Sequence, residues 1–459
     1  MVEMTAHPGR PRPGRWLSVA LALGLGLASV APAAAADPVT FGSPSASSSF
    51  GKSIEFRQPV ALASPPARVE LLLTTPGASG PNVTDIPAPT SGGTQDLTFA
   101  VDLTEGHIYP NTTFVARWRV TDPAEKTWLG PAVTQVYADD RFTWQTVTGT
   151  VVRAHWYKGN AAFGQRVLRI GDGAVADTSK LLGVTETDPI DFYVYADQDK
   201  FYDALGPAAR ENVGGEAHAD IRTMFALITP SEVGASWVET VVPHELTHLV
   251  FATAIKNPYH EPPHWLNEGL AVYLSEGYAQ FYRSSVEDAV RGDAVVPLAG
   301  LVGAFPTSQQ GFILGYGESV SAVDFIIRSY GRDALVGLIR SYAKGVSDDE
   351  AFKTAFGVDT VGFEAAWIKD LGATEPARRG PAAAPIGPLP SGWAGPLVIP
   401  SVVPGGAAAS GGAAVTPPSA GDGGGSSLGI VLGAVLVAVV ILAGLYAARR
   451  RKAKPLPPT

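Results

Sequence analysis

Cysteine is absent from all 459 residues of this chain. Without thiols the protein can form neither disulfide bonds nor cysteine metal sites, so its fold must depend on the burial of apolar side chains. Internal repeats are also absent from the sequence. A chain of this length is nevertheless long enough to build a sizeable core without covalent cross-links.

Positive charge is scarce in the central part of the chain. The formal net charge is −9, but eight of the 34 basic residues and only one of the 43 acidic residues lie in two terminal segments, 1–36 and 428–459. The remaining stretch holds 42 acidic and 26 basic residues, for a net charge of about −16. A body this acidic argues against nucleic acid as a partner.

The first 36 residues have the pattern of a secretory signal peptide. Three arginines precede the apolar stretch WLSVALALGLGLASVAP, and the small-residue run APAAAA follows it. This order predicts cleavage after Ala36, so that the mature chain begins at Asp37. The alternative is a transmembrane helix that stays in place, although the apolar run is short for a membrane span.

A second apolar segment lies near the C-terminus. Residues 428–448 form 21 residues without a charged side chain, which is long enough to cross a bilayer. Five basic residues follow within 449–459, and the positive-inside rule keeps this tail in the cytoplasm. The sequence therefore predicts a single-pass protein of the cell membrane with an extracellular N-terminal ectodomain.

Between these segments the composition divides the chain into three parts. Residues 37–140 contain short β-type runs separated by Gly, Pro, Ser and Asn, which predicts a small all-β, immunoglobulin-like sandwich domain. The alternative is a β-rich extension without a core of its own. Residues 142–373 combine strand and helix patterns, which predicts an α+β domain, and 374–427 are rich in Pro, Ala and Gly, which predicts a disordered linker.

The pattern HExxH occurs twice within residues 243–273, which read PHELTHLVFATAIKNPYHEPPHWLNEGLAVY. Two histidines four residues apart can bind one metal ion only where a helix places them one turn apart on the same face. HELTH, which starts at His244, continues into a helical pattern. HEPPH contains two prolines that break a helix, so we expect His260 and His264 to lie in a turn, where either could line a cleft without binding the metal.

Pro243 directly precedes the HELTH motif. Proline is tolerated in the first turn of a helix, so either the helix begins close to Pro243 or a longer helix from about Glu232 is kinked there. Both alternatives leave His244 and His248 on a common face.

The HELTH histidines predict a zinc site. His244 and His248 would each give a ring nitrogen to Zn²⁺, while Glu245 would lie beside the ion and act as general base. A third ligand is available in WLNEG, where Glu268 follows His248 with 19 residues between them and opens a new helix. The third histidine of metzincins has no counterpart, because Ala254 stands at that position. Three protein ligands leave one position open for water, which is typical of a catalytic zinc ion rather than a structural one.

These residues resemble the gluzincin metallopeptidases of the thermolysin and aminopeptidase N type, and most of all their compact bacterial peptidase MA-like members. The resemblance rests on HELTH and WLNEG and extends loosely over residues 145–373. It implies a gluzincin-like fold and a zinc peptidase with His244, His248 and Glu268 as ligands and Glu245 as general base. No GxMEN stretch of the aminopeptidase branch precedes the zinc helix. TMFALITPSEVG stands in its place, as a strand with which an extended peptide could pair.

Two further residues are candidates for supporting roles. Gluzincins commonly stabilise the oxyanion with a downstream Tyr or His, and Tyr316 in LGYGESVSAVDF is the candidate, with an ordinary packed tyrosine as the alternative. Asn267 is a candidate to orient its neighbour Glu268. We therefore predict a membrane-anchored extracellular metallopeptidase that uses one zinc ion and acts on a peptide or protein. The alternative is a catalytically silent cell-surface binding protein built on the same scaffold.

Overall fold

The computed structural model describes residues 37–104, 106–207, 214–257 and 259–376. The predicted signal peptide, membrane span and cytoplasmic tail lie outside these residues, as does nearly all of the predicted linker. Within the described part of the chain, no helix has the length and hydropathy needed to cross a membrane.

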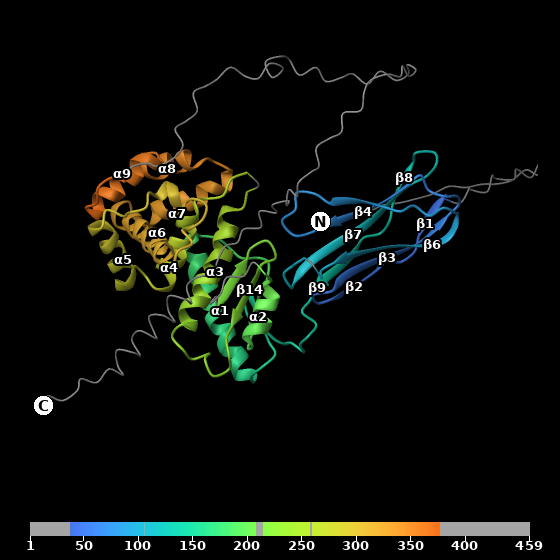
Figure 1. The fold of residues 1–459 in the computed structure, drawn as a ribbon, viewed down its shortest axis with the longest axis horizontal. Coiled ribbons are helices and arrows are strands. Elements are labelled where there is room, and N and C mark those ends of the chain that lie inside the picture. The colour runs from blue at the N-terminus through green and yellow to red at the C-terminus, as the bar shows by residue number, and fades with distance from the viewer. Residues whose placement is uncertain (1–36, 105, 208–213, 258, 377–459) are drawn as a thin grey trace, which may run out of the picture.

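Two antiparallel β-sheets form the N-terminal part, which we call the β domain (Figure 1). The first sheet consists of β1 (Val39–Phe41), β3 (Ser53–Leu62), β2 (Ser45–Ser49) and, also paired with β3, β6 (Gly93–Asp102). The second sheet consists of β5 (Asn82–Ile86), β4 (Arg68–Thr74), β7 (Thr112–Thr121), β8 (Thr127–Leu129) and, also paired with β7, β9 (Val133–Tyr137).

Alternating side chains hold these two sheets together. Along β3 and β7 every second residue is buried, as expected for strands that cover a core with one face. Phe56 of β3 and Phe114 of β7 meet between the sheets with ring centroids 6.4 Å apart. The inward side chains form a hydrophobic cluster separate from the rest of the molecule. The predicted all-β domain is thereby confirmed, whereas its immunoglobulin-like character stays a prediction.

A five-stranded mixed sheet organises the next part of the chain. Its spatial order is β10 (Gln145–Thr148), β11 (Val152–Trp156), β12 (Ile190–Tyr195), β14 (Thr223–Leu227) and β13 (Gly215–His218). The pairs β11–β12 and β12–β14 are parallel, and the two outer pairs are antiparallel. This sheet and the first three helices make up the α/β lobe, and the remaining helices make up the helical lobe.

The boundary between β10 and β11 differs from what the residue pattern alone indicates. The sequence from Thr148 to Tyr157 predicts one continuous strand, but the chain turns between β10 and β11. The reason lies in the following helix, where the Asp172 carboxylate accepts hydrogen bonds from the backbone N–H groups of Thr150 and Val152, at 2.9 and 3.0 Å. A side chain from α1 therefore satisfies donors that a longer strand would have paired.

Nine α-helices are present in the described residues: α1 (Ala161–Leu182), α2 (Gln198–Leu205), α3 (Val238–Ile255), α4 (His264–Ser275), α5 (Gln280–Arg291), α6 (Gln309–Ser329), α7 (Arg332–Ser341), α8 (Asp348–Phe356) and α9 (Thr360–Leu371). Helices α1 and α3 pack on one face of the mixed sheet and α2 on the other. Figure 1 shows the β domain and the helical lobe on opposite sides of the α/β lobe.

Local signals explain where two of these helices begin. The Asn160 side chain accepts a hydrogen bond from the N–H of Phe163 at the start of α1, and Gly183 ends this helix in a left-handed conformation. Ser347 and Glu350 form a capping box at the start of α8.

Helix α3 is buried along most of its circumference, because α1, β13, α4 and α7 all pack against it. It begins at Val238, five residues before Pro243, so neither predicted start of the zinc helix was right. Pro243 removes one backbone donor within the second turn. The hydroxyl of Thr247 donates to the Pro243 carbonyl at 2.8 Å, and the helix continues through the HELTH motif.

A buried carboxylate joins the β domain to the mixed sheet. Asn111, at a left-handed φ of 72°, donates from Nδ2 to Asp191 Oδ2 and to Thr223 Oγ1, both at 2.9 Å. Arg153 and His155 also contact Asp191. Burial alone would raise the pKa of Asp191, but the hydrogen bonds from His155, Arg153 and Asn111 lower it to about 2.

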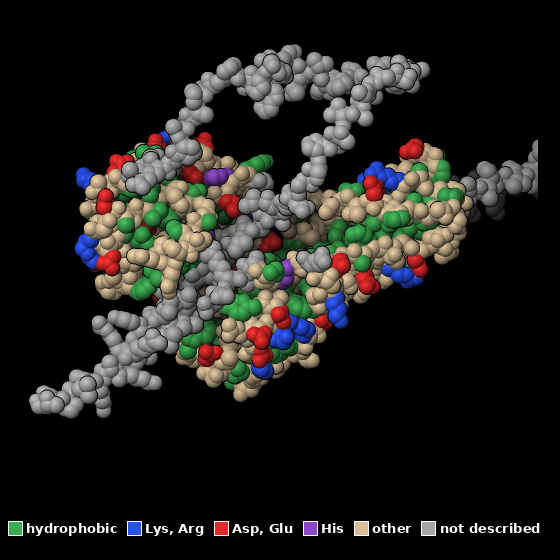
Figure 2. Space-filling model, in the orientation of Figure 1, with side chains coloured by type: hydrophobic (Ala, Val, Ile, Leu, Met, Phe, Trp, Pro, Cys, Tyr) green, Lys and Arg blue, Asp and Glu red, His purple; other side chains and the backbone are tan. Residues whose placement is uncertain are grey.

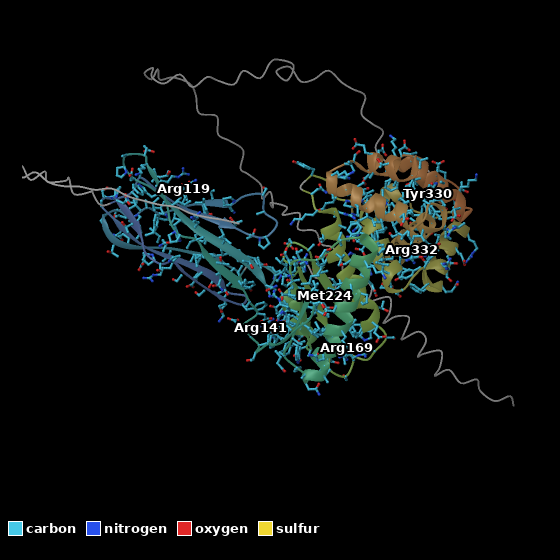
Figure 3. All side chains as sticks on the ribbon, turned by 180° about the vertical axis from the view of Figure 1, so that it is seen from behind. Arg119, Arg141, Arg169, Met224, Tyr330 and Arg332 are labelled. Carbon is cyan, nitrogen blue, oxygen red and sulfur yellow. The ribbon has the colours of Figure 1, made fainter. Side chains whose placement is uncertain are left out.

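A second contact lies beside the first, where Figure 3 labels Arg141 at the junction of the β domain and the α/β lobe. The Arg141 guanidinium contacts Asp139 and Asp203, each at 2.7 Å. Tyr195 of β12 donates from its hydroxyl to Asp139 at 2.8 Å. The two parts are therefore connected by hydrogen-bonded charges as well as by packed aromatic rings.

Candidate metal centre

The two histidines of HELTH lie on one face of α3. Their Nε2 atoms are 3.2 Å apart, and both side chains are almost completely buried. This proximity follows from the helical spacing of four residues. Both rings therefore present a nitrogen to the same point.

Glu268 of α4 completes this group. Its Oε2 atom lies 3.4 Å from His244 Nε2 and 3.7 Å from His248 Nε2. One ligand atom from each of the three residues lies within 4.8 Å of the other two. The third residue expected from WLNEG is thus brought to the HELTH histidines.

A glycine permits this approach of the helices. A Cβ atom at Gly269 would lie 2.4 Å from the backbone oxygen of Ser319 in α6, which is far inside the contact distance. Helix α4 can therefore pack directly on the α6 backbone, and Glu268 comes to lie between α3 and α6.

The protonation preferences suit a metal site. Burial lowers the pKa of His244, which favours a neutral ring with a free lone pair. Burial would raise the pKa of Glu268, but the three histidines that face it, His248 foremost, outweigh burial and bring its pKa well below its usual range. Neutral imidazoles and an ionised carboxylate are the forms that bind zinc.

The donor set fits a zinc ion. Among the described residues, Glu245 Oε2 and both carboxylate oxygens of Glu268 are buried at this site without a hydrogen-bond partner. Buried polar atoms in this state cost free energy unless another group satisfies them. Two imidazole nitrogens and one carboxylate oxygen are the ligands typical of a catalytic zinc site.

Glu245 lies next to this group without joining it. It is 1% exposed, and a backbone N–H of β13, that of Ala217, contacts its carboxyl group. Burial raises the pKa of Glu245 well above its usual range, and the charges of Glu268 and Glu216 raise it further. A Cβ atom at Gly215 would lie 3.1 Å from Glu245 Cγ, so this glycine makes room for the side chain.

Tyr316 of α6, the oxyanion candidate of the sequence, lies beside His244. Its ring centroid is 6.4 Å from that of His244, and Phe305 and Phe312 pack against the ring. Burial raises the pKa of Tyr316, and the nearby carboxylates of Glu268 and Glu245 raise it further. The hydroxyl therefore stays protonated and can donate a hydrogen bond.

Asn267 has a different partner from the expected one. Its Oδ1 atom lies 3.0 Å from His248 Nδ1, so it orients the ring of His248 rather than the carboxylate of Glu268. An acceptor at Nδ1 fixes the proton there and leaves Nε2 free to bind a metal. Asn267 does not contact its sequence neighbour Glu268 in this way, because consecutive residues of a helix point in different directions.

The HEPPH histidines separate from each other. His260 lies in a loop, 3.0 Å from Asp348 Oδ1, at a cleft of about 410 Å³ bordered by α8 and α9. On the face seen in Figure 2, histidine and acidic side chains lie side by side near α8. His264, by contrast, is not in a turn but is the first residue of α4, and its Nε2 lies 3.7 Å from Glu268 Oε1. The sequence reasoning missed this approach to the site.

The strand expected to pair with an extended peptide also needs correction. Its first five residues, TMFAL, form β14, which is paired on both sides, with β12 and with β13. The outer edge next to Glu245 belongs to β13, the short segment GEAH. In the described structure, β13 pairs with no strand other than β14.

Comparison with known proteins agrees with the geometry of the site. Residues 171–373 match the Peptidase MA superfamily, and this segment contains every residue of the metal centre. The fold and site thus define a scaffold of the zinc peptidase kind.

Among solved structures, the M1 zinc metallopeptidase of Deinococcus radiodurans is similar at 14% identity and a TM-score of 0.32, over 72% of this chain and 93% of that one. An aminopeptidase N family protein of Idiomarina loihiensis is similar at 13% identity and a TM-score of 0.35, over 69% of this chain and 58% of that one. No curated protein matches the chain.

Proposed function

We propose that this protein is a membrane-anchored extracellular peptidase that hydrolyses peptide bonds with one zinc ion. The supporting observation is that His244, His248 and Glu268 converge beside Glu245, all of them buried. When bound, zinc would supply a Lewis acid that polarises the scissile carbonyl and lowers the pKa of water.

Glu245 is the residue that moves the proton in this proposal. Its Oε2 atom has no hydrogen-bond partner among the described residues, and Glu245 is one helical position from His244, so the carboxylate is available at the site. Glu245 takes the proton of the attacking water and delivers it to the leaving amine. Tyr316 donates a hydrogen bond from its hydroxyl to the oxygen of the scissile carbonyl, which becomes negatively charged during the reaction.

The substrate in this proposal is an extended peptide that pairs with the outer edge of β13. Pairing with an edge strand uses backbone groups that every peptide carries, so it tolerates many sequences. Ala217 lies in β13 and contacts Glu245, so a chain added there would lie beside the general base.

The anchoring rests on the two apolar terminal segments of the sequence. We propose that residues 1–36 direct export and that residues 428–448 hold the enzyme in the membrane, with 374–427 as a linker. Deletion of 428–459 should release a soluble, secreted form, which fractionation of expressing cells would detect. Retention of that form in the membrane fraction would refute the anchor.

Cleavage profiling of a diverse peptide library by mass spectrometry tests the activity. The zinc-loaded ectodomain should cut peptides, and the Glu245→Gln form should not. The positions of the cuts would also distinguish an endopeptidase from an exopeptidase. If zinc binds but neither form cuts any peptide, the protein is a binding protein on a peptidase scaffold and the proposed activity is wrong.

A further inference from the structure

The carboxylate of Glu268 has two different sides in this structure. Its Oε2 atom faces the pair formed by His244 and His248, at 3.4 and 3.7 Å. Its Oε1 atom instead faces His264 Nε2 at 3.7 Å. Glu268 therefore lies between the metal-binding histidines and a third histidine behind them.

His264 is held in this position by contacts of its own. It is the first residue of α4, and its backbone N–H donates to the Val302 carbonyl at 2.8 Å. Its ring packs on Phe305 with centroids 4.7 Å apart, and the side chain is only 17% exposed. Residues four apart on a helix share a face, which directs the ring toward Glu268.

The position of His264 distinguishes it from a fourth metal ligand. Within the described residues, the converging ligand atoms come from His244, His248 and Glu268, and His264 is not among them. A nitrogen behind a ligating carboxylate can donate a hydrogen bond to the oxygen that the metal does not use. Such partners fix the orientation of metal ligands and strengthen metal binding.

We propose that His264 is a positioning residue: its Nε2, now 3.7 Å from Glu268 Oε1 and outside hydrogen-bond distance, closes to donate a hydrogen bond to Oε1 when Oε2 binds the metal, and thereby commits Oε2 alone to the metal. This inference assumes the metal site of the proposed function but not its peptidase activity. It gives the second HExxH segment a role: one of its histidines supports the ligand that the first segment needs.

Zinc affinity of the full-length protein tests the proposal, measured by competition with a chromogenic chelator. His264→Phe keeps an aromatic ring against Phe305 but removes the donor, and we expect it to weaken zinc binding ~10–100-fold. His264→Gln keeps an N–H donor and should recover most of this loss. His260→Phe changes the other histidine of the same segment, which pairs with Asp348, and should bind zinc like the parent.

A spectroscopic measurement separates positioning from simple packing. With Co²⁺ in place of zinc, His264→Phe should change the visible absorption bands, because the carboxylate then binds in a different mode, whereas His260→Phe should leave them unchanged. Zinc affinity of His264→Phe within about threefold of the parent would overturn the proposal. An equal loss in His264→Gln and His264→Phe would also overturn it, since the donated hydrogen bond would then contribute nothing. These measurements do not depend on whether any peptide is cleaved.

Discussion

The HELTH and HEPPH segments carry the same three signature residues on two different backbones. HELTH lies inside the 18-residue helix α3, which places His244 and His248 together and buries Glu245 beside them. In HEPPH the prolines end the loop and start α4, so its histidines point to different places. The comparison teaches that the pattern HExxH brings its two histidines together only where a helix continues through it.

The glutamates of the two HExxH segments should differ most in their effect on activity. Glu245→Gln is expected to lower kcat for peptide hydrolysis by a factor of ~10²–10⁴, because the residue can no longer accept a proton. Glu261→Gln changes an exposed side chain outside the metal group and should leave kcat unchanged. Steady-state kinetics of both zinc-loaded variants measure this difference. Equal activities of the two variants would remove Glu245 from the mechanism.

The second largest difference is expected between the histidines of the two HExxH segments, in how much bound zinc raises the stability of the folded state. A ligand present at 1,000 times its dissociation constant stabilises the folded state by ~4 kcal/mol, which for a domain of this size raises Tm by about 10 °C. Chelation with EDTA should therefore lower the Tm of the parent and of His260→Phe by that amount. His248→Phe should show no such response in a thermal scan. A full zinc response of His248→Phe would mean that the metal binds elsewhere.

Tyrosines near the two segments give a third contrast. Tyr316→Phe keeps the packing against Phe305 and Phe312 but removes the donor, so kcat should fall by ~10²-fold with little change in KM or zinc affinity. Tyr342, which donates to Asp348 near His260, is the matched control, and Tyr342→Phe should retain full kcat. An unchanged kcat of Tyr316→Phe would make Tyr316 a packing residue only.

The smallest expected effect is a gradual change of stability with pH, and it distinguishes two buried glutamates. Glu268 is surrounded by histidines and has a lowered pKa, whereas burial raises the pKa of Glu318 to about 8. Between pH 4.5 and 8 the folded state then holds a proton on Glu318 that the unfolded state lacks, so the free energy of unfolding decreases as the pH rises.

Glu318→Gln should lose this pH dependence. Its free energy of unfolding relative to the parent should increase by on the order of 1–3 kcal/mol from pH 5 to pH 9. Urea unfolding of both metal-free proteins at pH 5, 7 and 9 measures the difference. A constant difference across this range would show that Glu318 titrates in its ordinary range.

The convergence of the candidate metal ligands could largely be predicted from the sequence, because much of its geometry is local. Helical spacing brings His244 and His248 together, and the zinc ligand set requires a third residue such as Glu268. The partners of Asn267 and His264 could not be predicted in this way. They depend on how α4 packs against α3 and on the loop at Val302, which residue patterns do not encode.

The strands show the same division between local and distant causes. The apolar run of β12 is a clear strand signal, and the structure contains it. The GEAH segment of β13 has no residue with strong β-propensity, and it forms a strand only because β14 is available to pair with it. The break after Thr148 depends on Asp172, a residue more than twenty positions further along the chain.

The glycine that follows Glu268 determines how closely α4 can approach α6, and therefore where the Glu268 carboxylate lies. A methyl group at Gly269 would have to move about 1 Å to reach an ordinary contact with the Ser319 oxygen, now 2.4 Å from the Cβ position. Metal sites keep their function only when their ligands stay within ~0.5 Å of the productive geometry. One added carbon would therefore separate Glu268 from the α3 histidines and shift it relative to Tyr316, although neither side chain would be altered. The contact between Gly269 and Ser319 therefore controls how far Glu268 lies from the α3 histidines, and a change at Gly269 alters that distance without replacing any candidate ligand.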